Sequence, residues 1–89
     1  GPRSAAQLRS VGISNRQELI TAGAIPVYLR LKTRYPRTSL NFLYALTGAV
    51  ENCHWQDVAR NQREVLLQQL EGARALADLF NSQQDSLKP

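Results

Sequence analysis

The sequence has almost none of the residues that form disulfides or bind transition metals. Cys53 is the only cysteine and its neighbour His54 is the only histidine among the 89 residues. An internal disulfide needs a second cysteine, and a zinc site needs several histidine or cysteine ligands, so both are excluded and no cofactor is expected. We therefore interpret Cys53 as a small buried hydrophobic residue rather than a redox sensor.

Long apolar runs are also missing. No segment approaches the roughly 20 consecutive apolar residues of a membrane-spanning helix, and the N-terminus lacks the pattern of a secretory signal. The sequence therefore predicts a chain without membrane contact and with a cytoplasmic location. Its length is that of one domain, and the hydrophobic fraction of 43% is ordinary for a globular protein.

Acidic residues are few and scattered, and catalytic combinations are lacking. Seven acids stand against eleven Lys and Arg, which gives a net charge of +4. The acids lie in separate segments, so no carboxylate pair or magnesium site is indicated. Cys53 and His54 are consecutive, and consecutive side chains diverge, so they cannot form a nucleophile and base pair by themselves. We expect a protein that is not an enzyme.

One stretch of the chain concentrates positive charge. Arg30, Lys32, Arg34 and Arg37 fall within eight residues that contain no acid. Such a run is usually a solvated helix face. The alternative is an anion-binding stripe for nucleic-acid phosphates or for an acidic protein partner, and the stripe is the best candidate surface in the sequence.

The N-terminal third predicts two short helices joined by a tight turn. A helix over residues 4–11 ends at Gly12, where a left-handed residue would place Ile13 against Leu8 in a Schellman motif. Ser14 is then predicted as the N-cap of a second helix, with Gln17 completing a capping box. This second helix closes at Gly23.

The middle of the chain predicts two further helices. Pro26 suits the first position of a third helix, and Pro36 ends it. Thr38 or Ser39 caps a fourth helix, "SLNFLYALTGAVEN", which is apolar nearly all round and is predicted to be central and buried. Its small pair Gly48-Ala49 is where another backbone can approach closely.

The C-terminal part predicts one long helix that begins between Val58 and Gln62. No strand pattern occurs, so the sequence predicts an all-α single domain of about five helices over residues 1–80, with a polar, frayed tail at 81–89. The segment Glu71–Phe80 is predicted to protrude and to pair with a second copy as a homodimer, because its helix carries more apolar residues than one small domain covers. The heptad-like stripe consists of Leu66, Leu70, Ala73, Ala77 and Phe80.

Aromatic residues lie on apolar helix faces. Stacking on single-stranded nucleic acid is one role open to such side chains, but their positions favour core packing. The residues concerned are Tyr28, Tyr35, Phe42 and Tyr44. Trp55 is likewise predicted to fill the core beneath the last two helices.

Several segments together resemble one known family. "GPRSAAQLRSVGI", "LITAGA", "YLRLK", "SLNFLYALTGAVEN" and "HWQDV" match in order and spacing the C-terminal domain of the TfoX (Sxy) family of bacterial competence regulators, over about residues 1–70. Family members usually carry Leu-Pro where this chain has Val58-Ala59-Arg60. The final helix also extends past the usual end of the domain.

The resemblance implies a helical domain related to helix-hairpin-helix modules, in which Gly1-Pro2 belongs to the second half of the hairpin. It implies a role in switching on DNA-uptake genes through the transcription machinery or a regulator such as the cyclic AMP receptor protein, with DNA contact left open. In a hairpin of this kind Gly1, Arg3 and Ser4 would contact a phosphate. The other interpretation, which we favour, is that these residues form a helix start that serves packing alone. The alternative function is a sequence-nonspecific nucleic-acid-binding helix-hairpin-helix domain of a repair or recombination protein.

Overall fold

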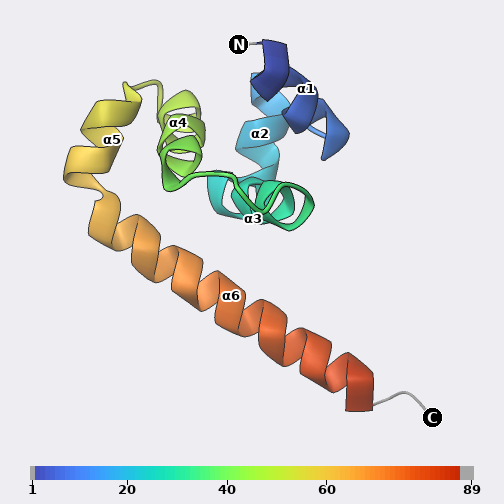
Figure 1. The fold of residues 1–89 in the computed structure, drawn as a ribbon. Coiled ribbons are helices and arrows are strands. Elements are labelled where there is room, and N and C mark those ends of the chain that lie inside the picture. Colours follow the sequence, from blue (N-terminus) through green and yellow to red (C-terminus); the bar gives the residue numbers. More distant parts are fainter. Residues whose placement is uncertain (1, 87–89) are drawn as a thin grey trace.

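The computed structural model describes residues 2–86 of the chain, and the side chains of residues 2–83. Within this range the regular structure is helical and contains no strand, which confirms the all-α prediction. The first five helices pack together, while the sixth projects from them as a long arm (Figure 1). The helices are α1 (Pro2–Ser10), α2 (Arg16–Ala22), α3 (Ala24–Arg34), α4 (Leu40–Glu51), α5 (Trp55–Asn61) and α6 (Arg63–Ser86).

The turn between α1 and α2 is the predicted Schellman motif. The amide of Ile13 donates to the carbonyl of Leu8 at 2.9 Å, and the amide of Gly12 donates to the carbonyl of Arg9 at 3.0 Å. Gly12 has φ +89°, a conformation in which a residue with a Cβ is strained. Ile13 is buried, so the turn also anchors this corner to the core.

The start of α2 lies one residue later than predicted, at Asn15 instead of Ser14. The Asn15 side chain accepts a hydrogen bond from the Glu18 amide at 2.8 Å, and the Glu18 carboxylate accepts one from the Ser14 amide at 2.7 Å. The shifted register puts a carboxylate, rather than the neutral Gln17, at the third helical position. A negative charge there also interacts favourably with the helix dipole.

Helix α3 begins two residues before the predicted start and ends where predicted. Pro26 is its third residue, where the missing N–H still costs no hydrogen bond because the first turn has no intrahelical acceptors. Tyr35 is the C-cap and Pro36 follows it. Lys32 closes the connection to α4, because its Nζ donates to the carbonyls of Pro36 at 2.7 Å and Thr38 at 2.9 Å.

Helix α4 is central, as predicted, since it packs against α2, α3 and α5. Ser39 is its N-cap in extended conformation, without a side-chain hydrogen bond to the first turn. Across the other end of α4, Arg16 donates to the carbonyls of Ala49 at 2.7 Å and Val50 at 3.1 Å. This guanidinium satisfies carbonyls that the helix leaves without partners, and it ties α2 to α4.

The close backbone approach predicted at Gly48-Ala49 occurs at Gly48, and the approaching backbone is the turn that follows the same helix. A Cβ at Gly48 would lie 2.5 Å from the carbonyl oxygen of Cys53. The Cys53 amide donates to the Gly48 carbonyl at 2.9 Å, so the turn folds directly back on the helix. Only a residue without a side chain fits there.

The region after this turn differs from the prediction in three ways. A separate helix, α5, precedes the long one, so the described chain has six helices instead of five. Its N-cap is His54, whose Nδ1 accepts from the Gln56 amide at 3.1 Å. Because histidine is not a favoured N-cap residue, no capping signal predicted this start. Trp55 is 38% exposed and stacks on His54 instead of filling the core, and Cys53 is exposed.

The long helix α6 joins the core only by its first part. Leu66 and Leu70 are buried against the core that includes Val27, Leu31 and Leu43. Further along, the apolar side chains of α6 are largely open to solvent, with exposed fractions of 65% for Leu76, 56% for Leu79 and 60% for Phe80. The helix continues through the polar residues to Ser86, and 87–89 lie outside the described residues.

Candidate functional site

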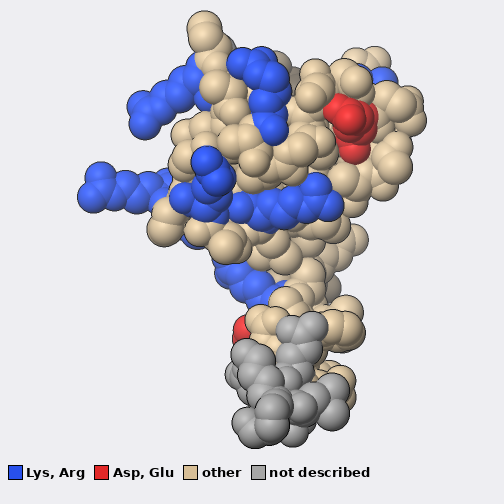
Figure 2. All heavy atoms as spheres, turned by 90° about the vertical axis from the view of Figure 1, so that its right-hand side faces the viewer, with Lys and Arg blue, Asp and Glu red and all other residues tan. Residues whose placement is uncertain are grey.

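Three arginines of the first half line a surface hollow of about 570 Å³ between α1, the α3–α4 connection and the start of α4. Figure 2 shows many Lys and Arg side chains and few acids on the face that it presents. No acid lines the hollow. Its lining residues are Arg3, Ser4 and Gln7 from α1, Arg34 to Thr38 from the end of α3 and the connection, and Ser39 and Phe42 from the start of α4. We call this the basic hollow.

Among residues 2–83, no carboxylate forms an ion pair with the three arginines of the basic hollow. The ion pair recorded among the described residues joins Arg60 and Asp57 on α5, away from these side chains. Helices α1 and α3 contain no acid, and none follows before Glu51. Arg3, Arg34 and Arg37 therefore present their charge to solvent and to whatever enters the hollow.

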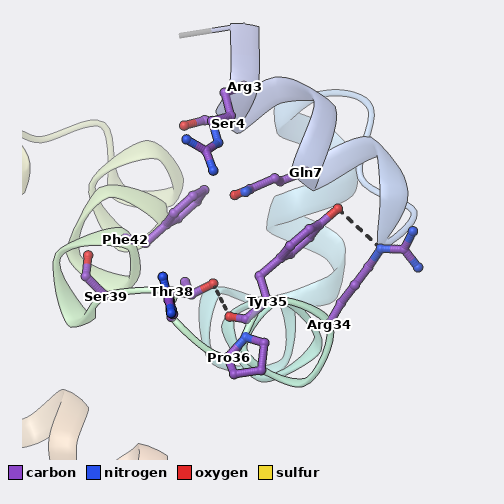
Figure 3. A pocket seen from close by; sticks show the side chains of 10 residues that line it. Arg3, Ser4, Gln7, Arg34, Tyr35, Pro36, Thr38, Ser39 and Phe42 are labelled. Atoms are coloured by element: carbon purple, nitrogen blue, oxygen red, sulfur yellow. Dashed lines mark hydrogen bonds between the residues drawn. The ribbon is translucent and has the colours of Figure 1, made fainter.

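Tyr35 forms one wall of the basic hollow and is held by hydrogen bonds on both sides of its hydroxyl. Arg34 Nε donates to this hydroxyl at 3.2 Å (Figure 3). Ser10 Oγ lies 2.8 Å from the same hydroxyl. Ser10 gives its own proton to the Gln7 carbonyl at 2.6 Å, so the Tyr35 hydroxyl is the donor to Ser10. The chain of bonds fixes the end of α3 to α1.

The same contacts favour ionisation of Tyr35. The hydrogen bond with Ser10, then the hydrogen bond and positive charge of Arg34, lower the pKa of the phenol from its ordinary value, while burial acts in the opposite direction. When the phenol loses its proton, the Ser10 hydroxyl can turn toward the phenolate and donate to it. The guanidinium of Arg34 lies 5.7 Å from the centre of the Tyr35 ring, close enough for a cation–π contact.

The structure brings together four of the six residues that the sequence singled out. Arg3, Ser4, Arg34 and Arg37 line the basic hollow. They come from α1, from the last turn of α3 and from the loop after it. The interpretation as one stripe on α3 does not describe this arrangement, because the site crosses from one helix to another.

The other two residues do not belong to the basic hollow. Arg30 Nη1 donates to the Val11 carbonyl at 3.4 Å, next to the α1–α2 turn. Lys32 is committed to the carbonyls of Pro36 and Thr38. On a helix residue 32 lies about 200° around the axis from residue 30 and from residue 34, so one face cannot carry all three. Gly1 lies outside the described residues.

Sequence reasoning missed two features of the site. Gln7 and Ser10 belong to it, and their spacing from Arg3 by four and then three residues is a polar stripe on α1 that could have indicated a shared face. Tyr35 and Phe42 were predicted in the core together with Tyr28 and Tyr44. Only the last two are fully buried, at 3% and 5% exposed, while Tyr35 and Phe42 are half-buried and line the hollow.

Elsewhere in the described residues no chemistry-bearing cluster competes with the basic hollow. No group of three or more His, Cys, Asp or Glu side chains among them is placed to hold a metal ion. No helix in the described part of the chain is both long and apolar enough to cross a membrane.

The family model described as the TfoX C-terminal domain matches residues 1–70, which include the basic hollow and the buried part of α6. Comparison with curated proteins and with solved structures found no match.

Proposed function

Because the chain belongs to the TfoX C-terminal domain family, we propose that it is a non-enzymatic regulatory domain that modulates transcription of competence genes, the genes of DNA uptake. It acts in the cytoplasm, where its protein partner is the transcription machinery or a regulator similar to the cyclic AMP receptor protein. The basic hollow is the part of the domain that contacts the nucleic-acid backbone.

One observation supports the backbone contact above the others. Three arginines from two separate parts of the chain line one hollow, and no acid is among its lining residues. Arginine is well suited to phosphate because its planar group donates two parallel hydrogen bonds to an anion. An acid-free arginine cluster on a protein of net charge +4 attracts phosphates at long range and binds them at short range.

The arrangement predicts the character of the binding. If each of the three arginines neutralises one phosphate of duplex DNA, log affinity falls with log salt at a slope of about −2.7, from about −0.9 per phosphate. Sequence preference is weak, because contacts to phosphates position a protein without reading base edges.

Charge reversal tests the backbone contact. The double variant Arg34→Glu/Arg37→Glu should abolish binding of a fluorescent duplex measured by anisotropy at low salt. The matched control Arg63→Glu/Arg74→Glu has the same change in net charge on α6 and should retain most of the binding. Equal losses in both variants would mean general attraction to a basic protein, and no binding by the unmodified domain would remove DNA from the proposal.

A measurement in cells tests the regulatory role. In the bacterium of origin, the same double variant should lower transcript levels of competence genes when it replaces the natural sequence, and the α6 control should not. Unchanged transcript levels with an increased sensitivity to DNA damage would instead support the alternative function, a nonspecific nucleic-acid-binding domain of a repair or recombination protein.

A further inference from the structure

Two aromatic rings project into the basic hollow beside the arginines. In Figure 3 the ring of Phe42 rises from α4 on one side and the ring of Tyr35 rises from the end of α3 on the other. The side chain of Gln7 reaches from α1 toward the space between the two rings. Tyr28 and Tyr44, by contrast, are buried in the core.

The two rings are held before any ligand arrives. Tyr35 is fixed at its hydroxyl by Ser10 and Arg34. Phe42 is in the first turn of α4, and its half-buried side chain packs against the core. A stacking surface that is already ordered loses little entropy when a flat ligand binds to it.

The combination of flat rings and arginines matches the chemistry of a nucleotide. A nucleobase stacks on an aromatic side chain, and its phosphates bind guanidinium groups. The amide of Gln7 and the hydroxyls of Ser4 and Ser39 offer donors and acceptors for the edge of a base. The volume of about 570 Å³ falls within the range of small-ligand pockets.

We propose that the basic hollow binds a nucleotide of a single strand, with its base against Phe42 and Tyr35 and its flanking phosphates on Arg3, Arg34 and Arg37. This proposal rests on the phosphate contact of the proposed function and adds the base. A base within a duplex is stacked on both faces and is not free to enter the hollow, whereas a base of a single strand is. The domain therefore prefers single strands to duplex, and DNA and RNA share the chemistry required.

Binding of three labelled nucleic acids, measured by fluorescence anisotropy at one salt concentration, tests the proposal. The probes are a 12-nucleotide oligo(dA), its duplex with oligo(dT), and oligo(rA) of the same length. The variants are Phe42→Leu, which removes the ring, and Phe42→Tyr, which keeps it, and both are checked by thermal melting. Arg74→Glu on α6 is the control for a change outside the hollow.

The proposal predicts that oligo(dA) or oligo(rA) binds at least about fivefold more tightly than the duplex, since stacking on one aromatic side chain contributes a factor of about 5 to 150 in affinity. Phe42→Leu should weaken that preference, because only Tyr35 then remains to stack on the base, and Phe42→Tyr should keep it. The difference in affinity between oligo(dA) and oligo(rA) identifies DNA or RNA as the preferred ligand.

Equal affinity for single strand and duplex, unchanged by Phe42→Leu, would overturn the base-binding role while leaving the phosphate contact in place. Loss of the preference in both Phe42 variants, with unchanged melting temperatures, would also overturn it, because the ring would then not be what matters. Absence of binding to all three probes would refute the phosphate contact of the proposed function itself.

Discussion

Replacing Gly12 by alanine tests whether the turn between α1 and α2 requires a glycine. The backbone of Gly12 has φ +89°, and nothing lies within 4 Å of the position that a Cβ would occupy. The penalty of Gly12→Ala is therefore conformational and not a clash, and it amounts to about 1 to 2 kcal/mol. For a domain of this size a loss of 1 kcal/mol lowers the melting temperature by roughly 4 to 8 °C.

Gly72→Ala is the matched control for this experiment, because it is the same chemical change in a helix. Gly72 lies in α6, also with nothing within 4 Å of its Cβ position, and without a positive φ. Alanine should stabilise a helix by about 0.5 to 1 kcal/mol relative to glycine. Thermal melts followed by circular dichroism should thus shift in opposite directions, and a Gly12→Ala melt at or above the unmodified value would refute the assignment of the turn.

Three further predictions concern other parts of the chain. Arg16→Ala should destabilise the domain by about 1 kcal/mol in urea titrations, because it removes charge-assisted bonds to the last carbonyls of α4, and an unchanged midpoint would contradict that role. Thr47→Val should raise the free energy of unfolding by about 1 kcal/mol, since the buried Thr47 hydroxyl has no hydrogen-bond partner; a loss in the same titration would show that the hydroxyl is satisfied. Sedimentation should show a dimer whose share rises with protein concentration, because apolar side chains of α6 are exposed. The Leu76→Ser/Phe80→Ser variant should be a monomer with the same melting temperature. A monomeric unmodified protein would rule out pairing through α6.

Local signals in the sequence predicted most of the helical framework. The stop at Gly12 and the end of α3 before Pro36 depend on the backbone limits of single residues, which act regardless of the rest of the fold. The central position of α4 followed from its nearly continuous apolar surface. These features needed no knowledge of tertiary contacts.

The predictions were wrong where two neighbouring residues could both serve as N-cap, and where tertiary contacts determine which side chains are buried. Ser14 and Asn15 are both good N-caps, and the choice of Asn15 depended on the carboxylate of Glu18. Trp55 was predicted inside the core because large aromatic residues usually contribute to it, but α5 places it at the first helical position, on the outside.

The candidate site was only partly predictable for the same reason. The density of charge around Arg34 and Arg37 is visible in the sequence. That Arg3 lines the same hollow depends on how α1 packs beside the α3–α4 connection. That packing includes the bond between Ser10 and Tyr35, which are 25 residues apart. No local pattern predicts such a contact.

Chemical-shift mapping by nuclear magnetic resonance tests the central claim, that the basic hollow is the surface that binds nucleic acid. When unlabelled oligo(dA) is added to the isotope-labelled domain, amide signals of residues 3–10 and 34–42 should shift, because these segments line the hollow. Signals of residues 71–83, on the projecting part of α6, should stay in place. Shifts concentrated on α6 or α5, or spread evenly over all basic residues, would contradict the account.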